Sequence, residues 1–84
     1  MNKLIHWSDE ARADVRAINR DTALRLLKSL ARFLETGAGD IKQLHGFNPP
    51  RYRLRFGDWR IVFRKRGDDA IEVIHVRNRK DAYR

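Results

Sequence analysis

The stretch that decides the fold spans residues 52–64 and has the sequence Tyr52-Arg53-Leu54-Arg55-Phe56-Gly57-Asp58-Trp59-Arg60-Ile61-Val62-Phe63-Arg64. Apolar residues alternate with arginines on both sides of a Gly-Asp pair, and strict alternation is typical of a half-buried β-strand. A glycine followed by a polar residue suits a two-residue type II′ turn. The stretch therefore predicts a β-hairpin with these cross-strand pairs: Phe56 with Trp59, Arg55 with Arg60, Leu54 with Ile61, Arg53 with Val62, and Tyr52 with Phe63.

The predicted hairpin has an apolar face and an arginine face. The apolar face, large enough to form a wall of the core, carries Tyr52, Leu54, Phe56, Trp59, Ile61 and Phe63. The arginine face carries Arg53, Arg55, Arg60 and Arg64. Like charges directly opposite each other, as Arg55 and Arg60 are here, destabilise a strand pair. Because a fold keeps such a cluster more readily when an anion binds to it, the arginine face points to phosphate, as in RNA or DNA.

The composition predicts one small intracellular domain. The chain has 84 residues, which we assign to a single domain over residues 1–84, and it is 42% hydrophobic, enough to bury a core. It has no cysteine, so neither a disulfide framework nor a thiolate metal site is available, and a reducing compartment fits. No apolar run approaches the roughly 18 residues of a membrane span. We therefore expect a cytoplasmic location and no membrane contact.

The positive charge is concentrated in the second part of the chain. The formal net charge is +8, and residues 51–84 hold eleven Lys or Arg against five Asp or Glu, compared with eight against six in residues 1–50. Most of the basic residues are arginines, whose planar guanidinium suits bidentate contacts to phosphate better than the ammonium of lysine does. This distribution supports a nucleic-acid partner.

Residues 1–37 predict a strand followed by two helices. A short strand is expected over residues 3–7, and Ser8 is a good N-cap for a helix in which Ala11, Val15 and Ile18 recur at helical spacing. Asn19 or Asp21 would cap a second helix that ends before Gly37. Its apolar stripe is predicted to consist of Leu24, Leu27, Ala31 and Leu34, widened by Leu30. The two antiparallel helices would form a helical hairpin that covers one face of the sheet.

The remaining residues predict a loop, the hairpin and a last strand. Residues 39–50 contain Gly46 and the Pro49-Pro50 pair and are expected to form a loop. The last strand is expected over residues 71–77, with apolar residues on both faces as in a central strand. Alternation places His75 on the same face as Ile71 and Val73, where a histidine is usually structural. The predicted fold is α+β with the order β-αα-βββ, in which antiparallel hairpins form a twisted sheet.

This order of elements resembles the RelE/ParE superfamily of bacterial toxins from type II toxin–antitoxin systems. The resemblance covers essentially the whole chain. It rests on the hairpin of residues 52–64 and on three further motifs: Trp7-Ser8 with Ala11, Leu44-His45-Gly46, and Val76 followed by Arg79-Lys80-Asp81-Ala82-Tyr83.

The resemblance to RelE-like members implies an endoribonuclease that cuts mRNA in the A site of the 70S ribosome without a metal or any other cofactor. In such enzymes the 2′-hydroxyl attacks the adjacent phosphate and leaves a 2′,3′-cyclic or 3′-phosphate and a 5′-hydroxyl. The family's catalytic positions correspond to Arg53, Arg55, Arg60, Arg79 and Tyr83 in this chain. Further basic residues that would contact mRNA or rRNA are Arg51, Arg64, Arg77 and Lys80.

One departure from the family concerns the general base. The best-known RelE-type enzymes have lysine where this chain has Arg53 and Arg55, and an arginine does not readily lose its proton near neutral pH. These two residues are therefore expected to stabilise the charge of the phosphorane. His75 is the candidate for an acid–base function. No histidine or carboxylate spacing suggests a metal site.

Two other functions share this fold. A ParE-like toxin would bind DNA gyrase and poison it without cutting RNA, and a toxin relic would bind RNA without catalysis. Either kind of toxin implies a cognate antitoxin. We expect an acidic, RelB-like protein that covers apolar and basic surfaces of the toxin with a helix or an extended segment.

Overall fold

The predicted hairpin forms the middle of the sheet. In the computed structural model, which describes residues 4–79, β3 (Arg51–Phe56) and β4 (Trp59–Lys65) pair antiparallel. Their register is the predicted one, from Tyr52 opposite Phe63 to Phe56 opposite Trp59. Leu54, Ile61 and Phe63 are buried, as a core wall requires.

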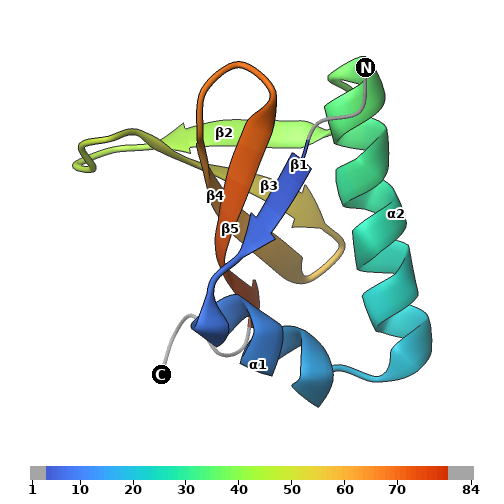
Figure 1. The fold of residues 1–84 in the computed structure, drawn as a ribbon. Helices are drawn as coiled ribbons and strands as arrows, with labels where there is room; N and C mark the ends of the chain where they lie inside the picture. The colour runs from blue at the N-terminus through green and yellow to red at the C-terminus, as the bar shows by residue number, and fades with distance from the viewer. Residues whose placement is uncertain (1–3, 80–84) are drawn as a thin grey trace.

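Three more strands extend the hairpin into a five-stranded mixed sheet (Figure 1). The strand order is β1-β5-β4-β3-β2, with β1 (Leu4–Trp7), β2 (Asp40–Leu44) and β5 (Ala70–Asn78). β1 pairs with β5 in parallel and the other neighbours are antiparallel. The α+β fold class is confirmed, and the central position expected for the last strand is confirmed as well.

The expectation of a loop over residues 39–50 was wrong for its first part, because Asp40–Leu44 is a strand. β2 is the edge of the sheet, and only Ile41 and Leu44 are apolar in it. A short edge strand takes its stability from pairing with its neighbour, here β3, so its own sequence shows little of the alternation that marks a strand. The order of elements is therefore β-αα-ββββ.

The two helices begin and end where the caps predict. α1 (Asp9–Ala17) is capped by Ser8, whose Oγ accepts a hydrogen bond from the N–H of Ala11. α2 (Arg20–Thr36) is capped by Asn19 and ends at Gly37, which has the left-handed φ of 74°. Both helices pack on one core, and Figure 1 shows α2 lying along the sheet while α1 lies at the end of β1 and β5.

The predicted apolar stripe of α2 was right for Leu30 and Leu34 and wrong for Leu24, Leu27 and Ala31, which are exposed. The buried side chains are Leu26 and Leu30, with Phe33 packed against the core. Leu24 and Leu27 are instead 46% and 37% exposed. Leucines occupy so much of the circumference of this helix that its sequence allows two stripes, and the packing partner Phe63 selects the one with Phe33.

A β-bulge in β5 changes the face on which His75 lies. Phe63 pairs with Val73 and Val62 pairs with His75, so Ile74 is an extra residue in β5. Before the bulge, Ile71 and Val73 face the core, and after it the core residue is Val76. The prediction that His75 shares a face with Ile71 and Val73 was therefore wrong. His75 lies on the arginine face.

α1 covers the edge of β5 that β1 leaves open. β1 pairs with β5 only as far as Val73. Beyond that point, Ser8 donates a hydrogen bond from Oγ to the carbonyl of Ile74 at 2.6 Å, and the carboxylate of Asp14 accepts one from the N–H of Val76 at 2.9 Å. These two side chains satisfy backbone groups that would otherwise be unpaired. Within residues 4–79, neither helix is long and apolar enough to cross a membrane.

Candidate functional site

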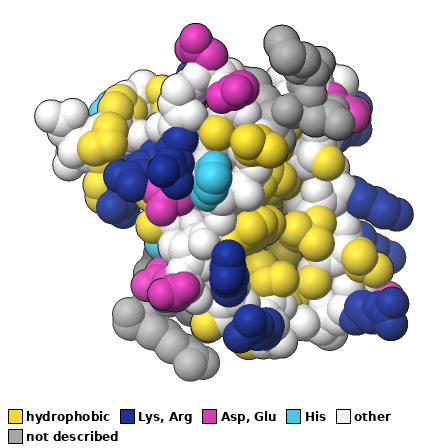
Figure 2. Space-filling model, in the orientation of Figure 1, with side chains coloured by type: hydrophobic (Ala, Val, Ile, Leu, Met, Phe, Trp, Pro, Cys, Tyr) yellow, Lys and Arg dark blue, Asp and Glu magenta, His cyan; other side chains and the backbone are white. Residues whose placement is uncertain are grey.

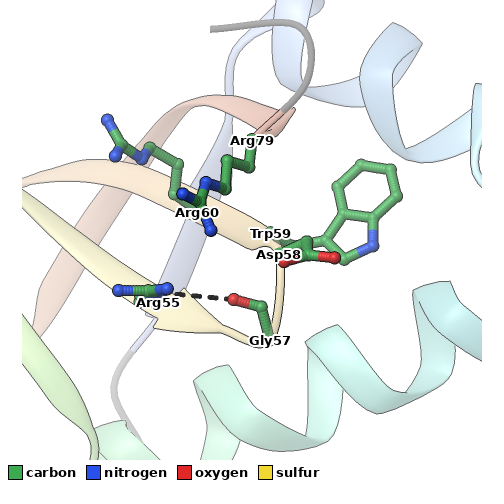
Figure 3. A pocket seen from close by; sticks show the side chains of 6 residues that line it. All are labelled: Arg55, Gly57, Asp58, Trp59, Arg60 and Arg79. Atoms are coloured by element: carbon green, nitrogen blue, oxygen red, sulfur yellow. Dashed lines mark hydrogen bonds between the residues drawn. The ribbon is translucent and has the colours of Figure 1, made fainter.

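Three arginines from three segments meet at one end of the arginine face. A pocket of about 160 Å³ is lined by Arg55, Gly57, Asp58, Trp59, Arg60 and Arg79. Figure 3 shows the three guanidinium groups on one side of the sheet and the indole of Trp59 turned away toward the helices. The N–H of Arg79 donates to the carbonyl of Asp58 at 2.6 Å, so the end of β5 is fixed beside the β3–β4 turn. We call this feature the arginine pocket.

The register places these charges in a row across the sheet. Arg55 is the cross-strand partner of Arg60, as predicted, and Arg60 is the partner of Arg77. Arg55 donates a hydrogen bond from Nε to the carbonyl of Gly57 at 3.3 Å, which turns its guanidinium toward the pocket. Among the residues that the structure describes, no carboxylate forms an ion pair with Arg55, Arg60 or Arg79. Their charges are free for an anion.

The other arginines of the face have acidic partners. Arg53 contacts Asp40 at 3.2 Å, and its side chain is only 15% exposed. Arg64 donates a hydrogen bond from Nε to Glu72 at 2.6 Å across the β4–β5 pair. Asp40 comes from β2, the strand that the sequence did not predict, so the restraint on Arg53 was not predicted either.

Arg77 is held by helix α1. Its Nη2 lies 2.6 Å from the carboxylate of Glu10, and its Nε lies 3.6 Å from that of Asp14. The hydrogen bond to Glu10 raises the pKa of Arg77 above its ordinary value. These contacts fix α1 against β5, so Arg77 has a structural partner as well as a place beside the pocket.

The remaining predicted residues lie at the borders of the face or outside the described part of the chain. Arg51 stacks its guanidinium over the ring of Phe47, 4.5 Å from the centroid, and that phenylalanine is 44% exposed. Phe47 was not among the predicted site residues, although it is an aromatic residue close to the Pro49-Pro50 pair. Lys80 and Tyr83 lie outside residues 4–79.

His75 is half-buried on the arginine face. Its Nδ1 is buried and has no hydrogen-bond partner in the described residues. Burial lowers the pKa of His75, and the positive charge of Arg77 lowers it further, while Glu10 and Asp14 act in the opposite direction. Arg51 adds a further lowering. The imidazole is therefore mainly neutral near pH 7 and is able to accept a proton.

The arginine pocket suits an anion rather than a metal ion. Three guanidinium groups around a small cavity can each donate charge-assisted hydrogen bonds to phosphate oxygens. Asp58 also lines the pocket, but its carboxylate makes no ion pair with any described residue. Within residues 4–79, no three His, Asp or Glu side chains cluster as metal ligands would.

A second surface feature is an apolar groove between the helices. It has a volume of about 330 Å³ and is lined by Trp7, Val15 and Leu27, with Arg12 and Arg16 at its border. Figure 2 shows apolar side chains gathered on this side of the molecule, with Lys and Arg side chains around them. We call it the apolar groove.

The fold is that of toxins from bacterial and archaeal toxin–antitoxin systems. The chain superposes on a chain of a RelBE toxin–antitoxin complex from Mycobacterium tuberculosis with a TM-score of 0.77 and 12% identity, covering 93% of this chain and 99% of that one. For the RelB–RelE complex from Methanococcus jannaschii the values are 0.74 and 22%, covering 93% and 94%. A mutant of Escherichia coli toxin RelE in the free state gives 0.65 and 18%, covering 99% and 90%. No curated protein matches the chain in sequence.

The family model that matches residues 5–83, together with the fold, defines a type II toxin of the RelE/ParE superfamily, as the sequence resemblance implied. More narrowly, the chain belongs to the family described as ParE toxin of type II toxin–antitoxin system, parDE, whose model matches residues 5–83.

Proposed function

We propose that this toxin is a ribosome-dependent endoribonuclease whose arginine pocket holds the scissile phosphate of mRNA. The observation that carries the proposal is the convergence of Arg55, Arg60 and Arg79, which have no ion-pair partner among the described residues. Attack of the 2′-hydroxyl on phosphorus adds negative charge to the phosphate oxygens, and fixed donors aimed at that charge lower the barrier. Each charge-assisted hydrogen bond contributes about 1.5–3 kcal/mol.

The role of each arginine in cleavage would depend on whether it has an acidic partner. Arg55, Arg60 and Arg79 stabilise the phosphorane because nothing in the described chain neutralises them. Arg53 and Arg64 are paired with Asp40 and Glu72 on the neighbouring strands. They would contact the adjacent backbone phosphates and hold the strands of the arginine face together. Single-stranded RNA fits this arrangement, because successive phosphates would follow the row of basic residues across the sheet.

The second candidate is poisoning of DNA gyrase, which the match to the ParE family model favours. In that case the arginine face would contact DNA or an acidic surface of gyrase, and no RNA would be cut. The arginine pocket, whose guanidinium groups have no ion-pair partner within residues 4–79, supports the nuclease more directly. Binding a protein surface does not require three guanidinium groups around one small cavity.

The proposed antitoxin would be an acidic protein with an amphipathic segment. The apolar groove offers Trp7, Val15 and Leu27 to the apolar side of a helix, and Arg12 and Arg16 offer charge complementarity to acidic residues beside it. The probe is the protein encoded beside the toxin gene. Leu27→Glu should weaken its binding at least about tenfold, and Arg32→Glu on the outward side of α2 should not; equal affinities for both variants would rule out this groove.

The experiment that tests the nuclease is primer extension on a defined mRNA, with and without programmed 70S ribosomes. Wild-type protein should give discrete A-site cuts only with ribosomes. Arg60→Gln should abolish them, whereas Arg32→Gln, which removes the same charge from the exposed side of α2, should cut like wild type. Intact mRNA, together with inhibition of supercoiling by purified gyrase, would transfer the assignment to the second candidate.

A further inference from the structure

The proposed nuclease needs a group that accepts the proton of the 2′-hydroxyl. This inference rests on the proposed function. The three arginines of the pocket cannot supply the base, since a guanidinium keeps its proton at any pH at which the protein works. Of the carboxylates on the arginine face, Asp40 is paired with Arg53 and Glu72 with Arg64. Asp58 lines the pocket at the β3–β4 turn, and His6 lies on the same face of the sheet but on β1, on the far side of β5 from the pocket. The imidazole of His75 is the histidine beside the row of Arg55, Arg60 and Arg77.

The bulge at Ile74 gives His75 its place. As the cross-strand partner of Val62, it points to the same side of the sheet as Arg60 and Arg77. Arg60 is the partner of Arg77, two residues along β5, so His75 lies diagonally from Arg60. Diagonal neighbours in an antiparallel pair have Cα atoms about 7–8 Å apart, within reach of long side chains that share one ligand. A nucleotide with its phosphate at Arg60 would thus have its ribose near the imidazole.

The surroundings of His75 suit proton acceptance. The buried Nδ1 of the ring has no hydrogen bond to any described residue, and leaving a buried polar atom without a partner is destabilising. A cost of this kind in a native structure is often explained by function. The charged groups that act on the ring are Arg77 on its own strand, Arg51 on β3, and Glu10 and Asp14 on α1. Burial and the two arginines keep the free imidazole neutral, while the two carboxylates act in the opposite direction. A bound phosphate would offset the arginines and raise the pKa of His75 during the reaction.

We infer that His75 is the general base of the cleavage reaction and takes the 2′-hydroxyl proton of the nucleotide whose phosphate lies in the arginine pocket. The proton moves to the imidazole of His75, the 2′-oxygen forms a bond to phosphorus, and the bond from phosphorus to the 5′-oxygen breaks. The products are a 2′,3′-cyclic phosphate and a 5′-hydroxyl, and the 5′-oxygen takes a proton from the imidazolium or from water. The step needs neither an oxidant nor a metal.

Single-turnover cleavage on programmed 70S ribosomes between pH 5.5 and 8.5 tests this role. The variant is His75→Gln, which is uncharged and similar in size, and the matched control is His6→Gln, which alters an exposed histidine of β1. General-base catalysis is worth about 10²–10⁴-fold, so His75→Gln should lose at least about 100-fold in rate. It should also lose the rise of rate with pH, while its ribosome affinity and melting temperature stay close to those of wild type.

Each outcome decides the matter. A His75→Gln protein that cuts within about threefold of wild type, or that keeps the same pH profile, would overturn the base assignment and leave the nuclease intact. A wild-type protein that cuts nothing would overturn both proposals. Loss of rate in His6→Gln as well would show that the effect is not specific to His75 and would also overturn the assignment.

Discussion

Arg60→Gln should make the free protein more stable while it removes activity. Arg60 lies directly opposite Arg55, and neither has an ion-pair partner among the described residues. Like charges directly opposite in a strand pair destabilise by roughly 0.2–1 kcal/mol. Arg77, on the other side of Arg60, adds little, because Glu10 and Asp14 hold it. Glutamine keeps most of the side-chain stem and removes the charge.

The expected gain is about 0.5 kcal/mol of unfolding free energy. For a domain of this size, 1 kcal/mol shifts the melting temperature by about 4–8 °C, so the shift should be about 2–4 °C upward at low salt. Because salt screens exposed charges, with a Debye length of about 3 Å at 1 M, the gain should nearly vanish there. Differential scanning calorimetry at both salt concentrations measures this difference directly.

The matched control is Arg32→Gln on the exposed side of α2, which has no cross-strand neighbour. Its melting temperature should stay within about 1 °C of wild type at either salt concentration, in line with the small effects of surface substitutions. A lower melting temperature for Arg60→Gln at low salt would refute the reasoning, since it would mean that the arginine row is not repulsive in the folded chain.

Two more predictions concern stability. Asp14→Ala should lower the unfolding free energy by about 1–3 kcal/mol, because it leaves the N–H of Val76 at the sheet edge without its acceptor; urea unfolding measures this loss, and an unchanged midpoint would contradict it. The lowered pKa of His75 means that below about pH 6.5 the unfolded chain binds a proton that the folded chain resists. Wild type should therefore lose stability as the pH falls through the folded pKa of His75, and His75→Gln should lose less; parallel pH profiles would contradict this.

The sequence pattern was enough to predict those features that depend on neighbouring residues in the chain. The hairpin register follows from alternation and the Gly57-Asp58 turn alone, because both strands bury one complete face. The helix caps at Ser8 and Asn19 are equally local, since each satisfies backbone N–H groups three residues along the chain.

Features that depend on tertiary packing could not be predicted from the sequence pattern. β2 is a strand because β3 offers a free edge, and nothing within its own five residues requires this. The bulge at Ile74 has no signature in a run of apolar residues, yet it moves His75 from the core face to the arginine face. An error of one residue in alternation thus placed His75, a predicted acid–base candidate, on the wrong face of the sheet. The arginine pocket was predicted in part, since Arg55 and Arg60 follow from the hairpin while the location of Arg79 depends on its backbone bond to Asp58.

The parallel pairing of β1 with β5 also determines when the chain can finish folding. Leu4 pairs with Ala70, so the first strand has no partner in the sheet until residue 70 has been synthesised. Contacts of such long sequence separation form late, because the entropy of closing the loop must be overcome first. During translation the β3–β4 hairpin can form early, but the sheet cannot close around β5 until residues 70–78 have been synthesised. Closure of the sheet, which also brings Arg79 beside the β3–β4 turn, therefore comes last in the folding of residues 4–79.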